Sequence, residues 1–549
     1  MRSSSALAAG LAAAAALVAT TAVGSSRELA LHPESLDLPG RPAAIVAADL
    51  DGDGRRDLVV FVAYSVWDQI GVEESTKMDD VAGLVEVLTV VPALLEHREI
   101  VVFRGRAEGG FETAGVRLPV DASVLSLAAG PPGLPIVVLT DDGLAALRWK
   151  AGDGQPVLAL EPLIHERPVL AGSETFVPHL GLVRDVDGDG IPDVLLPTPQ
   201  GVSIYLSGPH GLSTEPASRV ALPLDDPRDP SGRLLRHYPL PELRDVDGDH
   251  LPDLLVEHPR RDWNEFEVWR NLGHGRFAPP VVPLPPGPGA AERKGPRVVF
   301  FGDLDGDGVA EYVTQEDIEP GDDAGMRAEL EHARRPPSVL RLHRMRRDLT
   351  MEPEPYRVLR ISGYAFEGGD GDIQIPGGLQ DLDGDGRPDL VTVTLDFSVF
   401  QALRVLATKR IGIGLDFHVW CQGQDGDFRE VQGLDLAGKF NLDLNDLALG
   451  HLSEFAGDFD GDGRIDFLQM GRGRTVTIHR GQAGCRYPAK PDLELELREA
   501  PRDLGLVQVA DLDGDGRSDL LIVEPQEREA GSETTAPVRL DLYLSGGTP

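Results

Sequence analysis

Cysteine, aromatic residues and positive charge are scarce in this chain of 549 residues. It has two cysteines, Cys421 and Cys485, aromatic residues make up 5%, and 52 Lys and Arg stand against 90 Asp and Glu, a formal net charge of −38. That charge argues against binding to nucleic acid, whose phosphates require Lys and Arg, and against adsorption to an anionic membrane surface. The two cysteines are compatible with a disulfide in an exported protein, but the sequence leaves their pairing open.

Long apolar runs are also missing beyond the N-terminus, so the sequence predicts no membrane span. Near the start, Ala6–Ala19 is apolar, follows Arg2 and precedes small residues, which is typical of a secretory signal peptide cleaved near Gly24. We therefore expect residues 1–24 to be a signal peptide and the protein to be periplasmic, cell-surface or extracellular. The alternative is a flexible cytosolic tail.

The chain is rich in one acidic motif, D-x-D-G-D-G-x-x-D followed by a short apolar run. It begins at Asp49, Asp185, Asp245, Asp303, Asp381, Asp458 and Asp511. Acids at positions one, three and five of a tight loop can turn their oxygens toward one centre, and glycines at four and six permit positive φ. With the backbone carbonyl of position seven and the acid of position nine, these hard oxygen ligands suit Ca²⁺, which accepts more flexible coordination than Mg²⁺. The chain has no His or Cys ligands spaced for zinc.

Up to seven calcium sites are thus predicted. Their ligands, from positions one, three, five, seven and nine of each copy, are Asp49, Asp51, Asp53, Arg55 and Asp57; Asp185, Asp187, Asp189, Ile191 and Asp193; Asp245, Asp247, Asp249, Leu251 and Asp253; Asp303, Asp305, Asp307, Val309 and Glu311; Asp381, Asp383, Asp385, Arg387 and Asp389; Asp458, Asp460, Asp462, Arg464 and Asp466; Asp511, Asp513, Asp515, Arg517 and Asp519. Weaker binding is expected in the Asp245 loop, where His250 replaces the second glycine, and in the Asp303 loop, which ends in Glu311.

An EF-hand starts in the same way but needs a bidentate Glu at position twelve and a helix on each side. Position twelve is never acidic here, being Val60, Leu196, Val256, Thr314, Thr392, Gln469 and Ile522. The flanking segments, such as DLVVFVAY and DLLIVE, are short and rich in Val, Leu and Ile, which indicates strands. The repeated unit is therefore a strand, a calcium loop and a second strand.

With these features the chain resembles the FG-GAP or VCBS repeats, known from integrin α subunits and from exported bacterial proteins. VWRNLGHGRFAPP (Val268–Pro280), SIYLSGPHGL (Ser203–Leu212) and VVFFGDLDGDG (Val298–Gly308) resemble further parts of that repeat. The resemblance covers nearly all of the chain after the signal segment. It implies a calcium-binding β-propeller of four-stranded blades, with each calcium loop between the first and second strands.

The spacing of the motif predicts the number of blades. The first interval, from Asp49 to Asp185, is about twice the others, and Ser123–Trp149 within it repeats the strand rhythm with AAGPPGLP in place of the acids. Seven acidic units and one degenerate unit give an all-β, eight-bladed propeller. Residues 27–549 would form one domain, with Glu28–Gly40 completing the last blade. Seven blades, with the degenerate unit as an insertion, are the alternative.

Three insertions, near residues 65–98, 316–337 and 396–414, fall between second and third strands, on the face opposite the calcium loops. Long loops on a rigid scaffold commonly bind partners, so this face is expected to engage a protein or a glycan. No H-E-x-x-H or G-x-S-x-G motif is present, and no catalytic residue is assigned. We therefore expect a monomeric binding or adhesion module; the alternative is a sugar-active lyase or hydrolase on the same scaffold.

Overall fold

The computed structural model describes most of the chain after the N-terminal segment. The described residues are 29–64, 97–151, 156–178, 180–222, 240–257, 266–281, 297–321, 325–352, 354–365, 377–396, 410–443, 448–450, 454–470, 474–499, 507–525 and 538–546. The predicted signal peptide lies outside them. No helix among these residues is long and apolar enough to cross a membrane.

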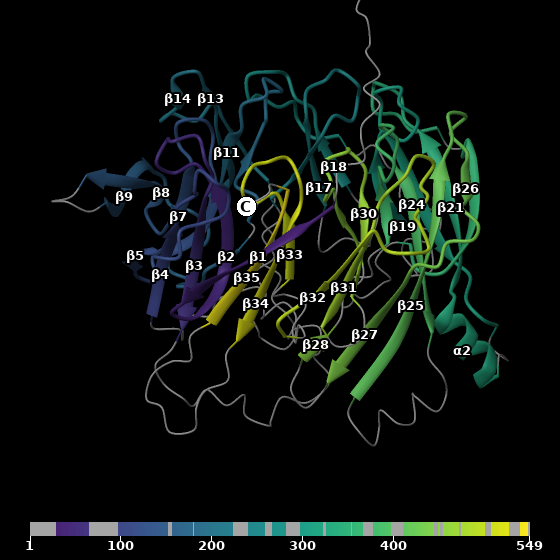
Figure 1. Cartoon of the computed structure of the whole chain (residues 1–549). Helices are drawn as coiled ribbons and strands as arrows, with labels where there is room; N and C mark the ends of the chain where they lie inside the picture. Colours follow the sequence, from purple (N-terminus) through teal and green to yellow (C-terminus); the bar gives the residue numbers. More distant parts are fainter. Residues whose placement is uncertain are drawn as a thin grey trace, which may run out of the picture.

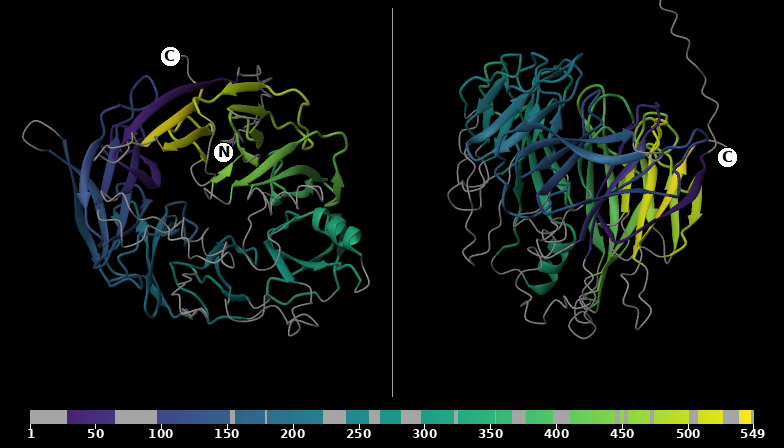
Figure 2. Two further views of the ribbon diagram at one scale, coloured as in Figure 1. Left: turned by 90° about the horizontal axis from the view of Figure 1, so that it is seen from below. Right: turned by 90° about the vertical axis from the view of Figure 1, so that its left-hand side faces the viewer.

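Eight antiparallel sheets follow one another along the chain and stand in a ring (Figure 1). Seen from below, the colours run once around the ring, from purple through teal and green to yellow, and yellow meets purple again (Figure 2). The chain is an eight-bladed β-propeller, as predicted, and the seven-bladed alternative is wrong.

The first four blades, in order of their strands, are β2 (Arg41–Ala48), β3 (Asp57–Tyr64), β4 (His97–Phe103) and β5 (Val116–Val120); β6 (Val124–Ala129), β7 (Ile136–Thr140), β8 (Gly143–Ala151) and β9 (Pro156–His165); β10 (Val183–Arg184), β11 (Asp193–Thr198), β12 (Gly201–Tyr205) and β15 (Ser218–Val220); β16 (Glu242–Arg244), β17 (Asp253–Glu257) and β18 (Phe266–Trp269). A small hairpin of β13 (Ser207–Gly208) and β14 (Gly211–Leu212) follows β12.

The other four blades are β19 (Arg297–Gly302), β20 (Glu311–Asp317), β21 (Pro337–Arg344) and β22 (Arg357–Ser362); β23 (Gly378–Gln380), β24 (Asp389–Asp396), β25 (Arg410–Gln422) and β27 (Ala437–Asp443), with β26 (Phe428–Glu430) and β28 (Ala448–Gly450) added; β29 (Glu454–Gly457), β30 (Asp466–Met470), β31 (Thr475–His479) and β32 (Leu493–Glu496); β33 (Val507–Ala510), β34 (Asp519–Pro525), β35 (Val538–Ser545) and β1 (Leu31–Leu38).

The hydrophobic core lies between neighbouring blades rather than at one centre. In β3, Val60 belongs to an apolar cluster shared with Leu521 of the last blade, whereas Phe61 belongs to one shared with Val138 of the second. Because each second strand is covered on both faces, its sequence reads as a continuous apolar run, and all six residues of β11 are buried. Outer strands such as β32 alternate in burial, since one face meets water.

The first strand and the last three strands share one sheet. β1 pairs with β35 in an antiparallel register that runs from Leu31 opposite Ser545 to Leu38 opposite Val538. The two ends of the chain therefore hold each other in one blade, and β1 covers an edge that β35 would otherwise expose.

The second blade has no acidic loop, as the degenerate repeat predicts. Its β6–β7 connection closes with a backbone hydrogen bond from Gly130 N–H to the Pro135 carbonyl at 2.8 Å, and Gly133 adopts φ 80°. The Arg148 guanidinium donates to the Gly133 carbonyl at 2.8 Å. Backbone bonds and one arginine thus hold this turn without any cluster of acids.

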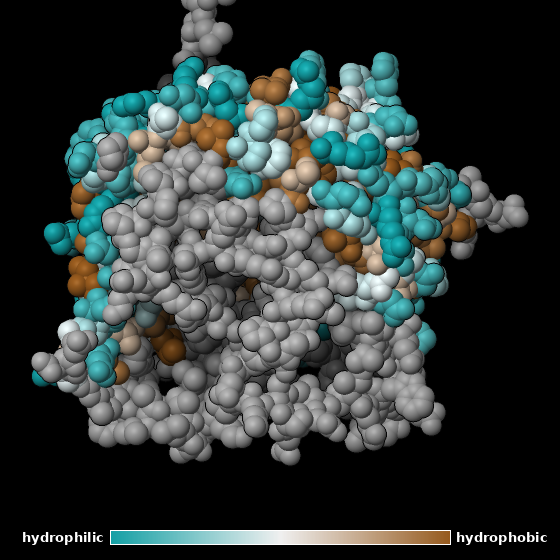
Figure 3. Space-filling model, turned by 180° about the vertical axis from the view of Figure 1, so that it is seen from behind, coloured by the Kyte–Doolittle hydropathy of each residue, from teal (hydrophilic) through white to brown (hydrophobic). Residues whose placement is uncertain are grey.

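The two ends of the propeller differ. The acidic loops lie at the end that carries β13 and β14, at the top in Figure 1, while α2 (Met326–Arg334) lies at the other end. This helix falls within the insertion near residues 316–337 and was not expected from the sequence. The other two insertions lie almost wholly outside the described residues. Seen from behind, the upper end is mainly hydrophilic, with scattered apolar side chains (Figure 3).

Candidate metal centres

The acid at position one organises each acidic loop from within. In the first copy, Asp49 accepts hydrogen bonds from Gly52 N–H at 2.8 Å and Gly54 N–H at 2.9 Å, one on each carboxylate oxygen. Both glycines have positive φ, 78° and 85°, which L-residues rarely adopt, so the turn depends on them. The same pair of bonds recurs in all seven copies.

The acid at position nine is the first residue of the second strand and is buried in every copy, at most 1% exposed. Asp519 is typical: one oxygen accepts Leu512 N–H at 2.8 Å and the other accepts Ser545 N–H, at the end of the third strand, at 2.7 Å. Asp57, Asp193, Asp253, Asp389 and Asp466 make the equivalent pair of bonds. This residue therefore fastens the acidic loop to the end of the third strand.

Burial raises the pKa of these position-nine acids, because it disfavours the charged form. The pKa rises to about 6 for Asp193 and Asp253, to about 7 for Asp389, Asp466 and Asp519, and to about 8 for Glu311; that of Asp57 is raised as well. Hydrogen bonds from the backbone oppose the rise, and neighbouring loop acids add to it. A divalent cation beside such a group would favour its charged form.

Position three supplies the carboxylate oxygen that lacks a hydrogen-bond donor. Asp247 is 2% exposed and Asp460 is 8% exposed, yet Oδ1 of each is buried without a hydrogen-bond donor among the described residues. Oδ1 of Asp187, Asp305 and Asp383 is in the same state. A buried carboxylate oxygen that lacks a donor is costly, so each of these atoms points to a missing partner.

Carboxylates do converge where the sequence places a metal. One oxygen each from Asp185, Asp187 and Asp193 lies within 4.8 Å of the others. The corresponding three acids of the Asp245 and Asp303 copies do the same, and so do Asp49, Asp51 and Asp53. These acidic groups could hold a metal ion. It remains a prediction that position five, and position seven through its carbonyl, complete the shell. In the structure the N–H of position seven donates to the carboxylate of position five, as from Arg55 to Asp53 at 3.0 Å.

The two atypical copies keep the loop shape. His250 takes φ 69°, in the left-handed region where the other copies have glycine, and its N–H still reaches Asp245 at 2.9 Å. That conformation costs a non-glycine residue about 1 kcal/mol or more. Glu311 is 1% exposed and its longer side chain accepts Leu304 N–H at 2.7 Å, so it keeps one of the two contacts of position nine.

The arginines that meet position three were not predicted from the sequence. Four arginines at the ends of third strands pair with position three: Arg104 with Asp51, Arg270 with Asp247, Arg344 with Asp305 and Arg480 with Asp460. The recurring Arg in FRG, WRN, HRM and HRG is the signal that could have revealed them.

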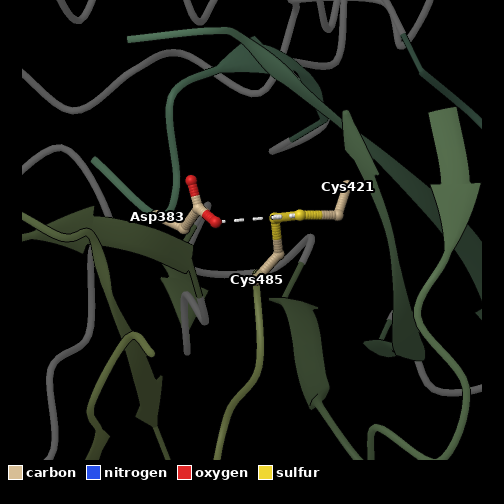
Figure 4. Close-up of side chains that lie close together, drawn as sticks. All are labelled: Asp383, Cys421 and Cys485. Atoms are coloured by element: carbon tan, nitrogen blue, oxygen red, sulfur yellow. Dashed lines mark hydrogen bonds between the residues drawn. A yellow bond between two sulfur atoms is a disulfide. The ribbon is translucent and has the colours of Figure 1, made fainter. Parts of the chain in front are cut away.

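In the sixth blade a disulfide occupies this position. Cys421, the equivalent residue, is joined to Cys485 of the seventh blade (Figure 4). Cys421 Sγ lies 3.9 Å from Asp383, and Gly484 N–H donates to the same carboxylate at 2.7 Å. The bond links two neighbouring blades beside an acidic loop, and it settles the pairing that the sequence left open.

Comparison with known proteins agrees with this architecture. Residues 245–314, which include the loops at Asp245 and Asp303, match the family described as FG-GAP-like repeat. No curated protein matches the chain. Among 53 matching chains of known structure is Zg3597, a family 117 glycoside hydrolase produced by the marine bacterium Zobellia galactanivorans. It shares 14% identity over 53% of this chain and 74% of its own, with a TM-score of 0.19, and at that score it carries no argument about function. The eight blades and the matched repeat fit an FG-GAP repeat propeller.

Proposed function

We propose that this FG-GAP repeat propeller is an exported calcium-binding scaffold that binds a protein or a glycan. The observation that carries the calcium proposal is the buried, unpartnered Oδ1 of Asp247, within reach of Asp245 and Asp253. Oxygen-only donor sets of this kind suit Ca²⁺ rather than zinc or copper. Within each loop, the acids at positions one, three, five and nine and the carbonyl at position seven would hold the ion.

Calcium would act on the scaffold rather than on a reaction. Three or four carboxylates within one turn repel one another, and a cation that binds the native loop stabilises the folded state. Because each loop is tied to the third strand through position nine, an ion in the loop would also tighten its blade.

The partner is proposed to dock at the end opposite the acidic loops. Two observations support this end: the strand ends that flank the first insertion, Tyr64 and His97, pair there, and α2 presents exposed charged side chains such as Arg327 and Glu329. Substitution Arg327→Glu is expected to weaken partner binding, whereas Glu108→Arg, at the acidic-loop end, serves as the matched control. Equal effects of the two would contradict the proposed face.

Calorimetric titration of EGTA-stripped protein tests the metal. Heat on adding Ca²⁺, with little on adding Mg²⁺, is expected, and Asp247→Ala should remove one site. Asp142→Ala, which removes an exposed acid in the β7–β8 turn, should remove none. Absence of calcium heat from the stripped wild-type protein would reject the calcium proposal.

Glycan arrays and capture from the native surface, each with calcium and with EGTA, test the partner. Binding that requires calcium is expected, because calcium holds the blades that present the docking end. N-terminal sequencing of the secreted protein tests export, and a start close to residue 25 is expected.

A further inference from the structure

The seven acidic loops fall into two classes according to the residue that lies opposite position nine, at the end of the third strand of their blade. It is arginine in four blades: Arg104, Arg270, Arg344 and Arg480. In the other three it is Leu206, Cys421 and Leu544. In six blades that residue immediately precedes the one whose N–H bonds the position-nine acid, as Arg270 precedes Asn271. In the fifth blade Arg344 lies opposite Glu311 in the strand register, so the side chain starts at the same place in all seven.

In the arginine class, the guanidinium meets the outer oxygen of position three. Arg270 donates through Nε to Asp247 Oδ2 at 2.7 Å, and a second nitrogen contacts the same atom. Arg344 lies 2.9 Å from Asp305 Oδ2, and Arg480 lies 3.2 Å from Asp460 Oδ2. Arg104 contacts Asp51 Oδ2 through Nε at 2.9 Å. The inner oxygen, Oδ1, stays without a donor in Asp247, Asp305 and Asp460.

In the other class, position three has no arginine or lysine within ion-pair distance among the described residues. In the blades of Asp187 and Asp513 the residue equivalent to the arginine is apolar, Leu206 and Leu544, and Asp383 lies beside the neutral disulfide. The Asp185 loop is the least compensated of all, since none of its acids meets a Lys or Arg in the described chain. In the eighth blade Arg56 reaches Asp511, at position one, with 3.3 Å between nitrogen and oxygen. Arginines at position seven pair with position five in loops of both classes, as Arg55 with Asp53 and Arg387 with Asp385, so the two classes differ at position three alone.

We propose that these arginines are built-in counterions that divide the loops into four that keep their shape without calcium and three that require it. The inference rests on the proposed calcium function and adds which loops depend on the ion. The calcium-requiring loops begin at Asp185, Asp381 and Asp511.

Electrostatics gives the direction of the effect. A guanidinium removes one uncompensated negative charge from a cluster of three or four, so the loop repels itself less when no ion is bound. The same positive charge repels an incoming Ca²⁺, and the calcium affinity of oxygen sites rises with the uncompensated charge of their ligands. A unit charge at about 6 Å from a divalent ion changes affinity on the order of tenfold in water-like surroundings.

In two of the pairs the acid is shielded from water, which separates them from ordinary surface ion pairs. The side chains of Asp247 and Asp460 are 2% and 8% exposed; Arg480 is 17% exposed, whereas Arg270 is 41% exposed and meets its buried acid from the surface. Removing one partner of such a pair leaves a buried charge uncompensated and costs far more than the pair contributes. In Arg270→Leu the charge of Asp247 would therefore have to be compensated by bound calcium.

Hydrogen exchange measured by mass spectrometry, on full-length protein with saturating calcium and with EGTA, tests the division loop by loop. In wild-type protein, EGTA should increase exchange in residues 185–192, 381–388 and 511–518. It should change exchange little in residues 49–56, 245–252, 303–310 and 458–465. An equal response of all seven loops would overturn the division while leaving calcium binding intact; no response in any loop would reject the calcium function itself.

A reciprocal exchange in neighbouring blades tests the cause. Arg270→Leu should make exchange in residues 245–252 depend on calcium, and Arg270→Lys should restore wild-type behaviour. Leu206→Arg should protect residues 185–192 in EGTA, with Leu206→Met as the uncharged control. If Arg270→Leu raises exchange equally with calcium and with EGTA, the arginine is merely a structural partner and the proposal is wrong. Should Leu206→Arg fail to fold, the Arg270 variants and the wild-type pattern still decide.

Discussion

At the scale of single residues, acids at different positions of the same loop differ in what they contact. In six loops position nine uses both oxygens on backbone N–H groups, so it holds the blade together whether or not an ion is present. Position three keeps one oxygen free of donors in five loops. A metal ion would therefore stabilise the carboxylate of position three more than that of position nine, whose oxygens already accept hydrogen bonds. Replacing Asp with Asn is therefore expected to change the free energy of unfolding differently at the two positions.

Asp519→Asn is expected to lower the free energy of unfolding by about 1–3 kcal/mol both in calcium and in EGTA, because its amide group would face a buried N–H. Asp513→Asn, in the same loop, is expected to lower it only in calcium. Urea unfolding of both variants under the two conditions measures this. Full stability of Asp519→Asn in EGTA would contradict the structural role of position nine.

Glu454, at the start of β29, offers a test that does not involve the acidic loops. It lines a cavity of about 210 Å³ with Gln380 and Phe455, and burial raises its pKa to about 7. Since the folded pKa exceeds the unfolded value of 4.5, the stability that its neutral form contributes is complete below that value and is lost as pH rises through 7. Glu454→Gln should therefore be more stable than wild type by ~1 kcal/mol near pH 8.5 and no more stable near pH 4.5. A stability difference that does not vary with pH would contradict the raised pKa.

At the scale of elements, the disulfide is a covalent cross-link between two blades, in addition to the backbone that connects them. Cys421 and Cys485 are 64 residues apart, so in the chain-entropy account the bond contributes about 4 kcal/mol. Replacing both cysteines with serine should lower the melting temperature, and hydrogen exchange should increase mainly in the sixth and seventh blades. A uniform increase around the ring would contradict a local role. Wild-type protein treated with a thiol reductant should match the variant.

Features that are local in sequence could be predicted, and features that depend on long-range pairing could not. The acids from Asp49 to Asp57 lie within nine residues, so their spacing alone indicates a shared centre, and AAGPPGLP marks the degenerate blade for the same reason. The Arg104–Asp51 pair joins residues 53 apart, and nothing within either segment indicates the other. Helix α2 was missed because EDIEPGDDAG, which precedes it, indicates a loop and hides the short helical segment after it.

At the scale of the whole molecule, the propeller is a ring in which each blade packs only on its two neighbours. An acidic loop that opens in one blade therefore loosens two interfaces, and β1 transmits the effect between the chain ends through its pairing with β35. Calcium at up to seven loops would act on nearly every interface, so it should change the stability of the ring as a unit.

Thermal unfolding of the full chain with saturating calcium and with excess EGTA tests this most directly. Binding to the native state at a concentration 100 times the dissociation constant adds about 2.7 kcal/mol per site. The melting temperature is expected to be several degrees higher in calcium, by roughly 1 °C for each kcal/mol gained in a chain of this size, with magnesium giving a smaller rise. An unchanged melting temperature would contradict it.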